Sequence, residues 1–251
     1  MSAKIIPLPK VYLEKILKPV NRLTESCVLK TKGPSLYTIC SSEDNSVILY
    51  AQTKIPLELE EDIRLNLISI KKLLSGLDCL GSDGEFSIKI GENSITCQTV
   101  SPDNEKTHFK YHLVDDSIVK ESVLRIEKFA ELSFDTEFMI SANKAKQILS
   151  AASFASDVSK VYFSVLEDTL QAEINDHTLQ NVDNITIPIT TKWEGQILDG
   201  TFPISLEIFK NLAAIKNDIK VKISNQFKVM LFNINEEDNL ELKYVVSALI
   251  K

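Results

Sequence analysis

Segments in which apolar and polar residues alternate recur along most of the chain, and others are rich in β-branched residues. Alternation with a period of two places every second side chain on one face of an extended chain, so these segments predict β-strands. The predicted strands span residues 26–31, 35–40, 46–52, 62–68, 85–90, 94–100, 108–114, 160–165, 169–174, 184–189, 219–223, 227–232 and 240–246. The tight polar links at 91–93 and 167–168 predict antiparallel hairpins.

Four windows have apolar residues at helical spacing instead. They are residues 9–23, 69–77, 141–155 and 205–216. In the first window Pro9 lies near the start, where its missing N–H does no harm, and Pro19 is expected to kink the helix or end it early. Ser69 and Ser205 stand at the expected N-cap positions, because a serine hydroxyl can accept a hydrogen bond from the first turn.

The order of these elements repeats along the chain. The helix at 69–77 leads into two strands and then into a strand that carries a Lys-Tyr pair at 110–111. The helix at 205–216 leads into two strands and then into a strand that carries the same pair at 243–244. Self-similarity over such a distance indicates a duplicated structural unit.

The remaining two helices complete the repeat, because the windows 9–23 and 141–155 are each followed by three predicted strands. The chain therefore predicts an α+β protein made of two copies of one domain, at residues 1–115 and 137–251. The segment 116–136 fits neither a helix stripe nor a flexible linker. It is expected to form an ordered connector that crosses the outside of both domains.

The charges are unevenly spread. The chain has 28 lysines and arginines against 35 aspartates and glutamates, a net charge of −7, and on totals alone a nucleic-acid-binding protein is disfavoured. The four helical windows nevertheless hold ten of the 28 bases and two of the 35 acids. Basic helices on an otherwise acidic protein predict a surface that attracts phosphates, the alternative being ordinary solvated lysines. The bases are Lys10, Lys15, Lys18, Arg22, Lys71, Lys72, Lys144, Lys146, Lys210 and Lys216.

The doubled domain, the four short basic helices and the closing segment 242–246 (Leu-Lys-Tyr-Val-Val) resemble the sliding DNA clamps, which are polymerase processivity factors. The resemblance is nearest to the clamps of tailed bacteriophages, with the proliferating-cell-nuclear-antigen (PCNA) type close behind. It covers nearly the whole chain, is strongest at 137–170 and 244–246, and rests on order and spacing.

The resemblance implies the DNA-clamp fold, in which each of two similar domains has antiparallel sheets outside and two short helices inside. It also implies a homotrimeric ring of six domains that encircles duplex DNA and tethers a replicative DNA polymerase. The ten basic residues above would line the hole and contact phosphates without reading bases. An ATP-dependent clamp loader and proteins with short clamp-binding peptides are the further partners that the resemblance implies.

A shallow apolar pocket for such peptides is expected near the connector and the end of the chain. The candidate residues are Ile126, Phe129, Val245, Val246 and Ser247. Ordinary core positions are the alternative for each of these residues taken singly.

Other classes of protein are disfavoured. The sequence has no P-loop, dinucleotide-binding, zinc-protease or serine-hydrolase motif. The protein is therefore expected not to be an enzyme and to bind no cofactor. Cys27, Cys40, Cys79 and Cys97 lack metal-ligand spacing and predict free thiols, and no metal site is expected. Neither a signal peptide nor a membrane span is predicted. We therefore expect the cytoplasm, or the host cytoplasm if the protein is viral.

Two competing functions remain open at this stage. One is a clamp-like polymerase accessory subunit that works as a monomer, although the net charge of −7 argues against binding by charge alone. The other is a viral structural or assembly β-protein without a role at DNA. The second would account for the strands, but it would account for neither the repeat nor the basic helices.

Overall fold

The structure is a computed structural model that describes residues 4–6, 8–54, 62–81, 84–119, 132–155, 157–175, 183–198, 200–235 and 240–248. The packing of the backbone divides the chain into two compact units. Unit 1 consists mainly of Met1–Asn45 and Leu49–Leu124, and unit 2 mainly of Arg125–Glu237 and Glu241–Lys251. Most of the expected connector, 116–136, lies outside the described residues.

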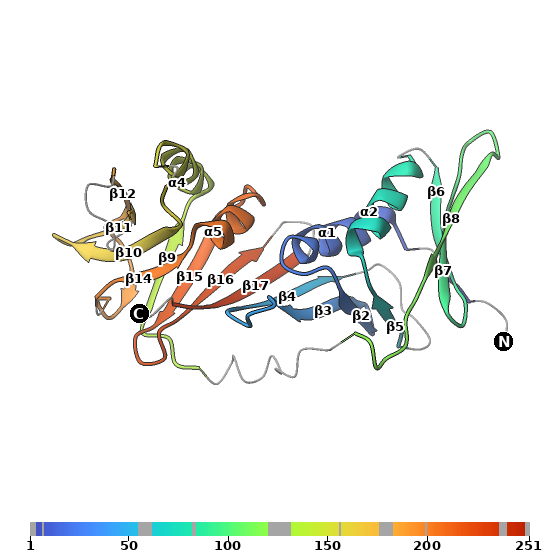
Figure 1. The fold of residues 1–251 in the computed structure, drawn as a ribbon, viewed down its shortest axis with the longest axis horizontal. Helices are drawn as coiled ribbons and strands as arrows, with labels where there is room; N and C mark the ends of the chain where they lie inside the picture. The colour runs from blue at the N-terminus through green and yellow to red at the C-terminus, as the bar shows by residue number, and fades with distance from the viewer. Residues whose placement is uncertain are drawn as a thin grey trace. The chain divides into compact units, whose positions relative to one another are not determined.

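Unit 1 contains two helices and eight strands within its described residues (Figure 1). In chain order these are β1 (Lys4–Ile6), α1 (Lys10–Asn21), β2 (Cys27–Lys32), β3 (Ser35–Ser41), β4 (Val47–Lys54), β5 (Arg64–Leu67), α2 (Ile70–Cys79), β6 (Glu85–Ile90), β7 (Ser94–Val100) and β8 (Lys106–His112). One sheet has the order β1-β6-β7-β8, and in a second group β5, β2, β3 and β4 are neighbours in that order. The two helices pack against each other.

Unit 2 is built in the same way. Its described elements are β9 (Thr136–Ile140), α4 (Ala142–Phe154), β10 (Lys160–Leu166), β11 (Thr169–Ile174), β12 (Ile185–Thr190), β13 (Glu194–Gly195), β14 (Phe202–Ser205), α5 (Leu206–Ala213), β15 (Ile219–Ser224), β16 (Val229–Asn235) and β17 (Leu240–Ser247). One sheet has the order β12-β11-β10-β14, and β13, β9, β15, β16 and β17 are neighbours in that order. Here α4 packs against α5.

The two units repeat one arrangement of elements. The run β1-α1-β2-β3-β4 corresponds in order and pairing to β9-α4-β10-β11-β12, and β5-α2-β6-β7-β8 corresponds to β14-α5-β15-β16-β17. The Lys-Tyr strands β8 and β17 are equivalent, and both tyrosines, Tyr111 and Tyr244, are buried. The expected duplication of an α+β fold is therefore confirmed.

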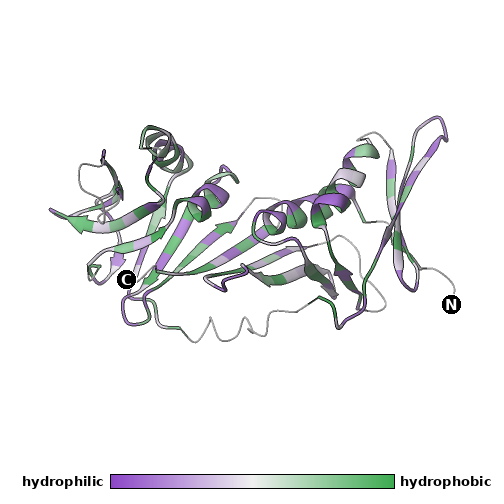
Figure 2. Ribbon diagram, in the orientation of Figure 1, coloured by the Kyte–Doolittle hydropathy of each residue, from purple (hydrophilic) through white to green (hydrophobic). Residues whose placement is uncertain are grey.

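Apolar and polar residues alternate along the helices (Figure 2), and the apolar stripe of each helix is buried. In α1 the stripe includes Leu13, Ile16 and Val20, each at most 2% exposed. Pro19 lies inside α1, and the helix ends two residues after it at Asn21, before the predicted bound of residue 23. Pro19 lies in the last turn, where its missing N–H removes one i→i−4 hydrogen bond, to the carbonyl of residue 15, close to the end of the helix.

Ser69 and Ser205 occupy the predicted N-cap positions, but neither side chain makes the expected capping hydrogen bond. Ser69 precedes α2 in a left-handed conformation with φ 55°, and its side chain makes no capping hydrogen bond. The N–H of Ile70 instead donates to the carbonyl of Glu25 at 2.9 Å. Ser205 ends β14, and the N–H of the following residue, Leu206, donates to the carbonyl of Ser159 at 2.9 Å. Backbone carbonyls from neighbouring segments thus satisfy the first N–H of each of these helices.

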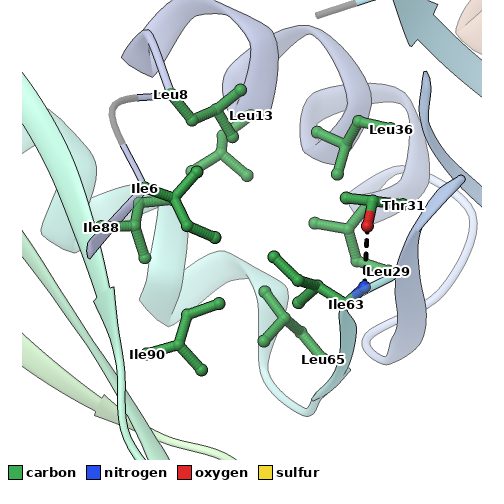
Figure 3. A pocket seen from close by; sticks show the side chains of 10 residues that line it. All are labelled: Ile6, Leu8, Leu13, Leu29, Thr31, Leu36, Ile63, Leu65, Ile88 and Ile90. Carbon is green, nitrogen blue, oxygen red and sulfur yellow. Dashed lines mark hydrogen bonds between the residues drawn. The ribbon is translucent and has the colours of Figure 1, made fainter. Parts of the chain in front are cut away.

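A small apolar cavity lies inside unit 1 between β1 and β6 on one side and β2 and β5 on the other (Figure 3). Its volume of about 20 Å³ is enough for roughly one water. The one polar side chain in its lining is Thr31, whose hydroxyl accepts a hydrogen bond from the N–H of Ile63 at 2.8 Å. A buried water needs two to four polar partners and the lining offers a single hydroxyl, so the cavity is a gap in the core and not a ligand site.

Gly76 in α2 packs closely against the ring of Phe109 in β8. A Cβ at Gly76 would lie 2.8 Å from two ring carbons of Phe109 in β8. Gly76→Ala is therefore expected to destabilise the protein by about 1–3 kcal/mol through overpacking, although alanine normally favours a helix. Urea unfolding measures the change.

The control is Ser75→Ala, because Ser75 is exposed in the same helix and its replacement should be neutral or slightly stabilising. Gly76→Ala/Phe109→Leu should regain part of the loss because it shortens the opposing side chain. A stabilised Gly76→Ala variant would contradict this packing.

Candidate nucleic-acid interface

The helices carry a basic bias on their solvent sides. Within the observed bounds they contain eight lysines against three acids, Glu14, Asp78 and Glu207. The bias is smaller than the sequence windows predicted, since α2 extends to Cys79 and includes Asp78. The prediction that Lys216 lies on the fourth helix is wrong, because α5 ends at Ala213 and Lys216 follows in a left-handed turn.

In α1 the carboxylate of Glu14 forms ion pairs with two of the lysines that the sequence predicts to contact DNA. Glu14 lies 2.8 Å from Lys18 and 3.4 Å from Lys10, an i±4 arrangement, and Lys10 also donates to the carbonyl of Gly81 at 2.9 Å. Burial opposes ionisation of Glu14, but the hydrogen bond and charge of Lys18, with those of Lys10, outweigh it and lower its pKa. Lys15 is half-buried, and Arg22 is the exposed C-cap residue of the helix.

The other three helices present lysines directly to solvent. Lys71 and Lys72 are exposed in the first turn of α2, Lys146 is exposed in α4, and Lys210 is exposed in α5. Lys144 in α4 is half-buried, and its N–H donates to the N-cap hydroxyl of Ser141 at 3.3 Å. Because α1 packs on α2 and α4 on α5, each unit gathers its helical lysines on one pair of adjacent helices.

The predicted peptide pocket is only partly described. Ile126 and Phe129 lie outside the described residues. Val245 and Val246 lie in β17 and are 8% and 1% exposed, so Val246 belongs to the core, while Ser247 is exposed at the end of the strand. The structure therefore does not bring the five predicted pocket residues together as a described surface.

The described residues also bear on metal binding, thiol reactivity and membrane spans. That part contains no cluster of three His, Cys, Asp or Glu side chains that could hold a metal. Burial raises the pKa of the Cys27 and Cys97 thiols to about 12, and the pKa of Cys40 is raised as well, which favours the protonated thiol over the reactive thiolate at neutral pH. No described helix is long and apolar enough to span a membrane.

Comparison with known proteins shows which solved structures have a similar fold. No family model matches the sequence, and no curated protein matches it. Solved structures match over the full length: PCNA from Entamoeba histolytica superposes with a TM-score of 0.76 at 13% identity, covering 100% of both chains. PCNA from A. fulgidus, solved with the C-terminal region of FEN-1 bound, gives 0.74 at 13% identity and covers 100% of this chain and 99% of that chain.

The chain has the DNA-clamp fold. A PCNA2–PCNA3 complex from Sulfolobus tokodaii superposes equally well, with a TM-score of 0.75 at 11% identity over 98% of this chain and 99% of that one.

The pairing of Lys10 and Lys18 with Glu14 was missed at the sequence level, although spacings of four residues on either side of Glu14 indicate it.

Proposed function

We propose that this protein is a sliding clamp, a ring that encircles duplex DNA and tethers a replicative DNA polymerase. The observation that carries the proposal is the DNA-clamp fold over the whole chain combined with solvent-facing lysines on all four described helices. Lysines contact phosphates without reading bases, so the grip on DNA is weak, salt-dependent and mobile. The protein performs no reaction of its own and needs no cofactor.

In the proposed ring three chains supply six units. Each four-stranded sheet has two edge strands, and the longer one is β8 in unit 1 and β12 in unit 2. Among the described residues, no further strand of the chain pairs with the outer edge of β8 or of β12. Open edges present unpaired N–H and C=O groups, and two different edges on one chain allow head-to-tail association that can close into a ring. β8 of one chain and β12 of the next are the strands we propose to pair.

An apolar side chain beside β12 supports this interface. α4 packs against β12, and its last residue, Phe154, is 64% exposed. Burying a phenylalanine stabilises an interface by about 1.5–3 kcal/mol. In the proposed ring Phe154 packs against the neighbouring chain beside the β8–β12 pair.

A closed ring explains how weak contacts suffice. A ring cannot leave the duplex sideways, so a polymerase bound to it stays at high effective concentration near the primer end. We propose that an ATP-dependent loader opens the ring, and that polymerase and other partners dock through short peptides in a pocket near Ile126, Phe129, Val245 and Ser247. Val246 faces the core from the other side of β17, so it supports this strand and does not line the pocket. The A. fulgidus PCNA bound to the C-terminal region of FEN-1 supports docking through such segments. The resemblance to phage clamps supports a viral source and action in the host cytoplasm.

The mass of the native particle tests the proposal against a monomeric accessory subunit. We expect sedimentation equilibrium to give three chains per particle at micromolar concentration. A monomer that binds linear and circular DNA equally would favour the monomeric alternative. A monomer without affinity for DNA would overturn both.

Glu14 offers a gain-of-function test. Glu14→Gln removes the carboxylate that pairs with Lys18 and Lys10, and Lys10 keeps its hydrogen bond to the carbonyl of Gly81. The substitution is expected to raise affinity for a short duplex about threefold at low salt, because Lys18 becomes available as one more cationic contact per chain. Fluorescence anisotropy measures the change.

Glu241→Gln is the matched control, since it removes a carboxylate from Lys243 on the strand β17. An equal gain in that control would mean that only net charge matters.

A further inference from the structure

A row of basic side chains lies on the sheet face of unit 1 that turns away from the helices. In β8, Phe109 packs against Gly76 of α2 and Tyr111 is buried, so the alternate residues point to the other face. Those residues are Lys106, His108, Lys110 and His112, and all four are exposed. At about 6.8 Å for every second residue, the row is about 20 Å long. We refer to these four residues as the β8 row.

The neighbouring strands do not neutralise the β8 row. The β7 residues directly opposite are uncharged: Ser94, Thr96, Gln98 and Val100. One strand further, β6 adds Lys89 opposite Thr96 and Glu85 opposite Val100, and β1 adds the exposed apolar Ile5 opposite Lys89. Within the described part of the chain, Lys89, Lys106 and Lys110 make no ion pair.

The equivalent face of unit 2 also carries lysines, so the two copies of the repeat can be compared. There Lys220 and Lys222 of β15 both pair with Glu137 of β9, the second at 2.9 Å, and Lys243 of β17 pairs with Glu241 at 2.7 Å. Burial opposes ionisation of Glu137, but the two lysines outweigh it and lower its pKa. One copy of the repeat therefore satisfies its surface lysines within the chain, and the other copy leaves them open.

We propose that the β8 row is a docking site for an acidic, extended segment of a partner protein. Alternate side chains of an extended segment share one face with the period of the β8 row, so carboxylates at every second position can each meet a basic group. Carboxylates that meet Lys106 and Lys110 form charge-assisted hydrogen bonds, which are the stronger kind, and carboxylates that meet His108 and His112 can accept hydrogen bonds from the imidazole N–H groups. The hydroxyl and amide groups of Ser94, Thr96 and Gln98 add donors beside the row.

A single-stranded nucleic acid fits this face less well. Such ligands rely on aromatic side chains on which bases stack. The outward positions of β6, β7 and β8 carry no Phe, Tyr or Trp in the described residues, because Phe86 and Phe109 alternate toward the helix side. The face is also opposite to the side that carries α2. The proposal therefore does not depend on DNA binding by the helices. A segment docked on the face of β8 also leaves free the strand edge that we propose to pair with β12 of the next chain.

Fluorescence anisotropy of a labelled peptide with alternating Glu and Thr, added to the full chain, tests the proposal. A peptide with alternating Gln and Thr is the neutral probe. We expect the Glu peptide to bind and the Gln peptide not to bind. We expect Lys106→Ser/Lys110→Ser to weaken binding about fivefold or more, and added salt to weaken it as well.

Lys220→Ser/Lys222→Ser is the matched control, because it removes two lysines from the equivalent face of unit 2, and it should leave affinity unchanged. Both sites are solvent-facing, and circular dichroism checks that each variant is folded. Equal loss in the control, equal binding of the Gln peptide, or no binding of the Glu peptide would overturn the proposal. Tighter binding of oligo-dT that is lost in Lys106→Ser/Lys110→Ser would assign the row to nucleic acid instead.

Discussion

Replacing Lys71, Lys72, Lys146 and Lys210 with glutamine is expected to weaken binding to duplex DNA about 100-fold at about 100 mM salt. These four side chains are exposed on three different helices, and none of them makes an ion pair within the described residues. Each phosphate contact that is lost also lowers the slope of log affinity against log salt by about 0.9. Anisotropy with a labelled duplex over a series of salt concentrations measures both quantities.

The control removes the same number of lysines from the sheet faces: Lys106, Lys110, Lys220 and Lys222 to glutamine. This variant keeps the helical lysines and is expected to retain most of the affinity and of the salt slope. An equal loss in both variants would mean that DNA responds to net charge alone, and the helices would then not be the DNA-binding surface.

Phe154→Glu is expected to convert the proposed trimer into monomers at micromolar concentration. Phe154 is 64% exposed within its own chain, so the substitution should leave the free energy of unfolding of one chain almost unchanged. In the interface it replaces an apolar contact with a buried charge that has no partner, which costs several kcal/mol for each of the three interfaces. Sedimentation velocity measures the number of chains per particle.

Phe227→Glu serves as the comparison, because Phe227 is also exposed, at 51%, but lies in the turn between β15 and β16. It is expected to remain trimeric. A trimeric Phe154→Glu variant would show that α4 and β12 do not form the interface between chains.

Strict alternation allowed several strands to be predicted closely. The bounds of β6, β7 and β11 agree with the sequence pattern, and the link at 167–168 between β10 and β11 has the positive φ angles of 47° and 56° that a tight hairpin turn needs. The strands β1, β9, β13 and β14 were not predicted. They are two to five residues long. So short a segment carries no measurable period, and it becomes a strand through pairing with distant residues.

The sequence allowed the basic residues of the candidate DNA-binding site to be predicted, but not how deeply each of them is buried. That the helices are basic follows from the sequence, whereas the burial of Lys15 and Lys144 depends on tertiary packing. In β17 the alternation already separates Val246, which lies on the core side with Tyr244, from Val245 and Ser247 on the other face. The open strand edges of β8 and β12 depend on the whole sheet order, which a single sequence does not specify.

The most direct test of the ring is whether the protein stays on DNA by topology. The protein is allowed to thread onto a linear duplex, both DNA ends are then blocked with bound streptavidin, and the complex is washed at high salt, which screens the lysine–phosphate contacts. The account predicts that the protein remains on the blocked DNA and leaves after one internal restriction cut. Retention after the cut, or equal loss from blocked and unblocked DNA, would contradict it.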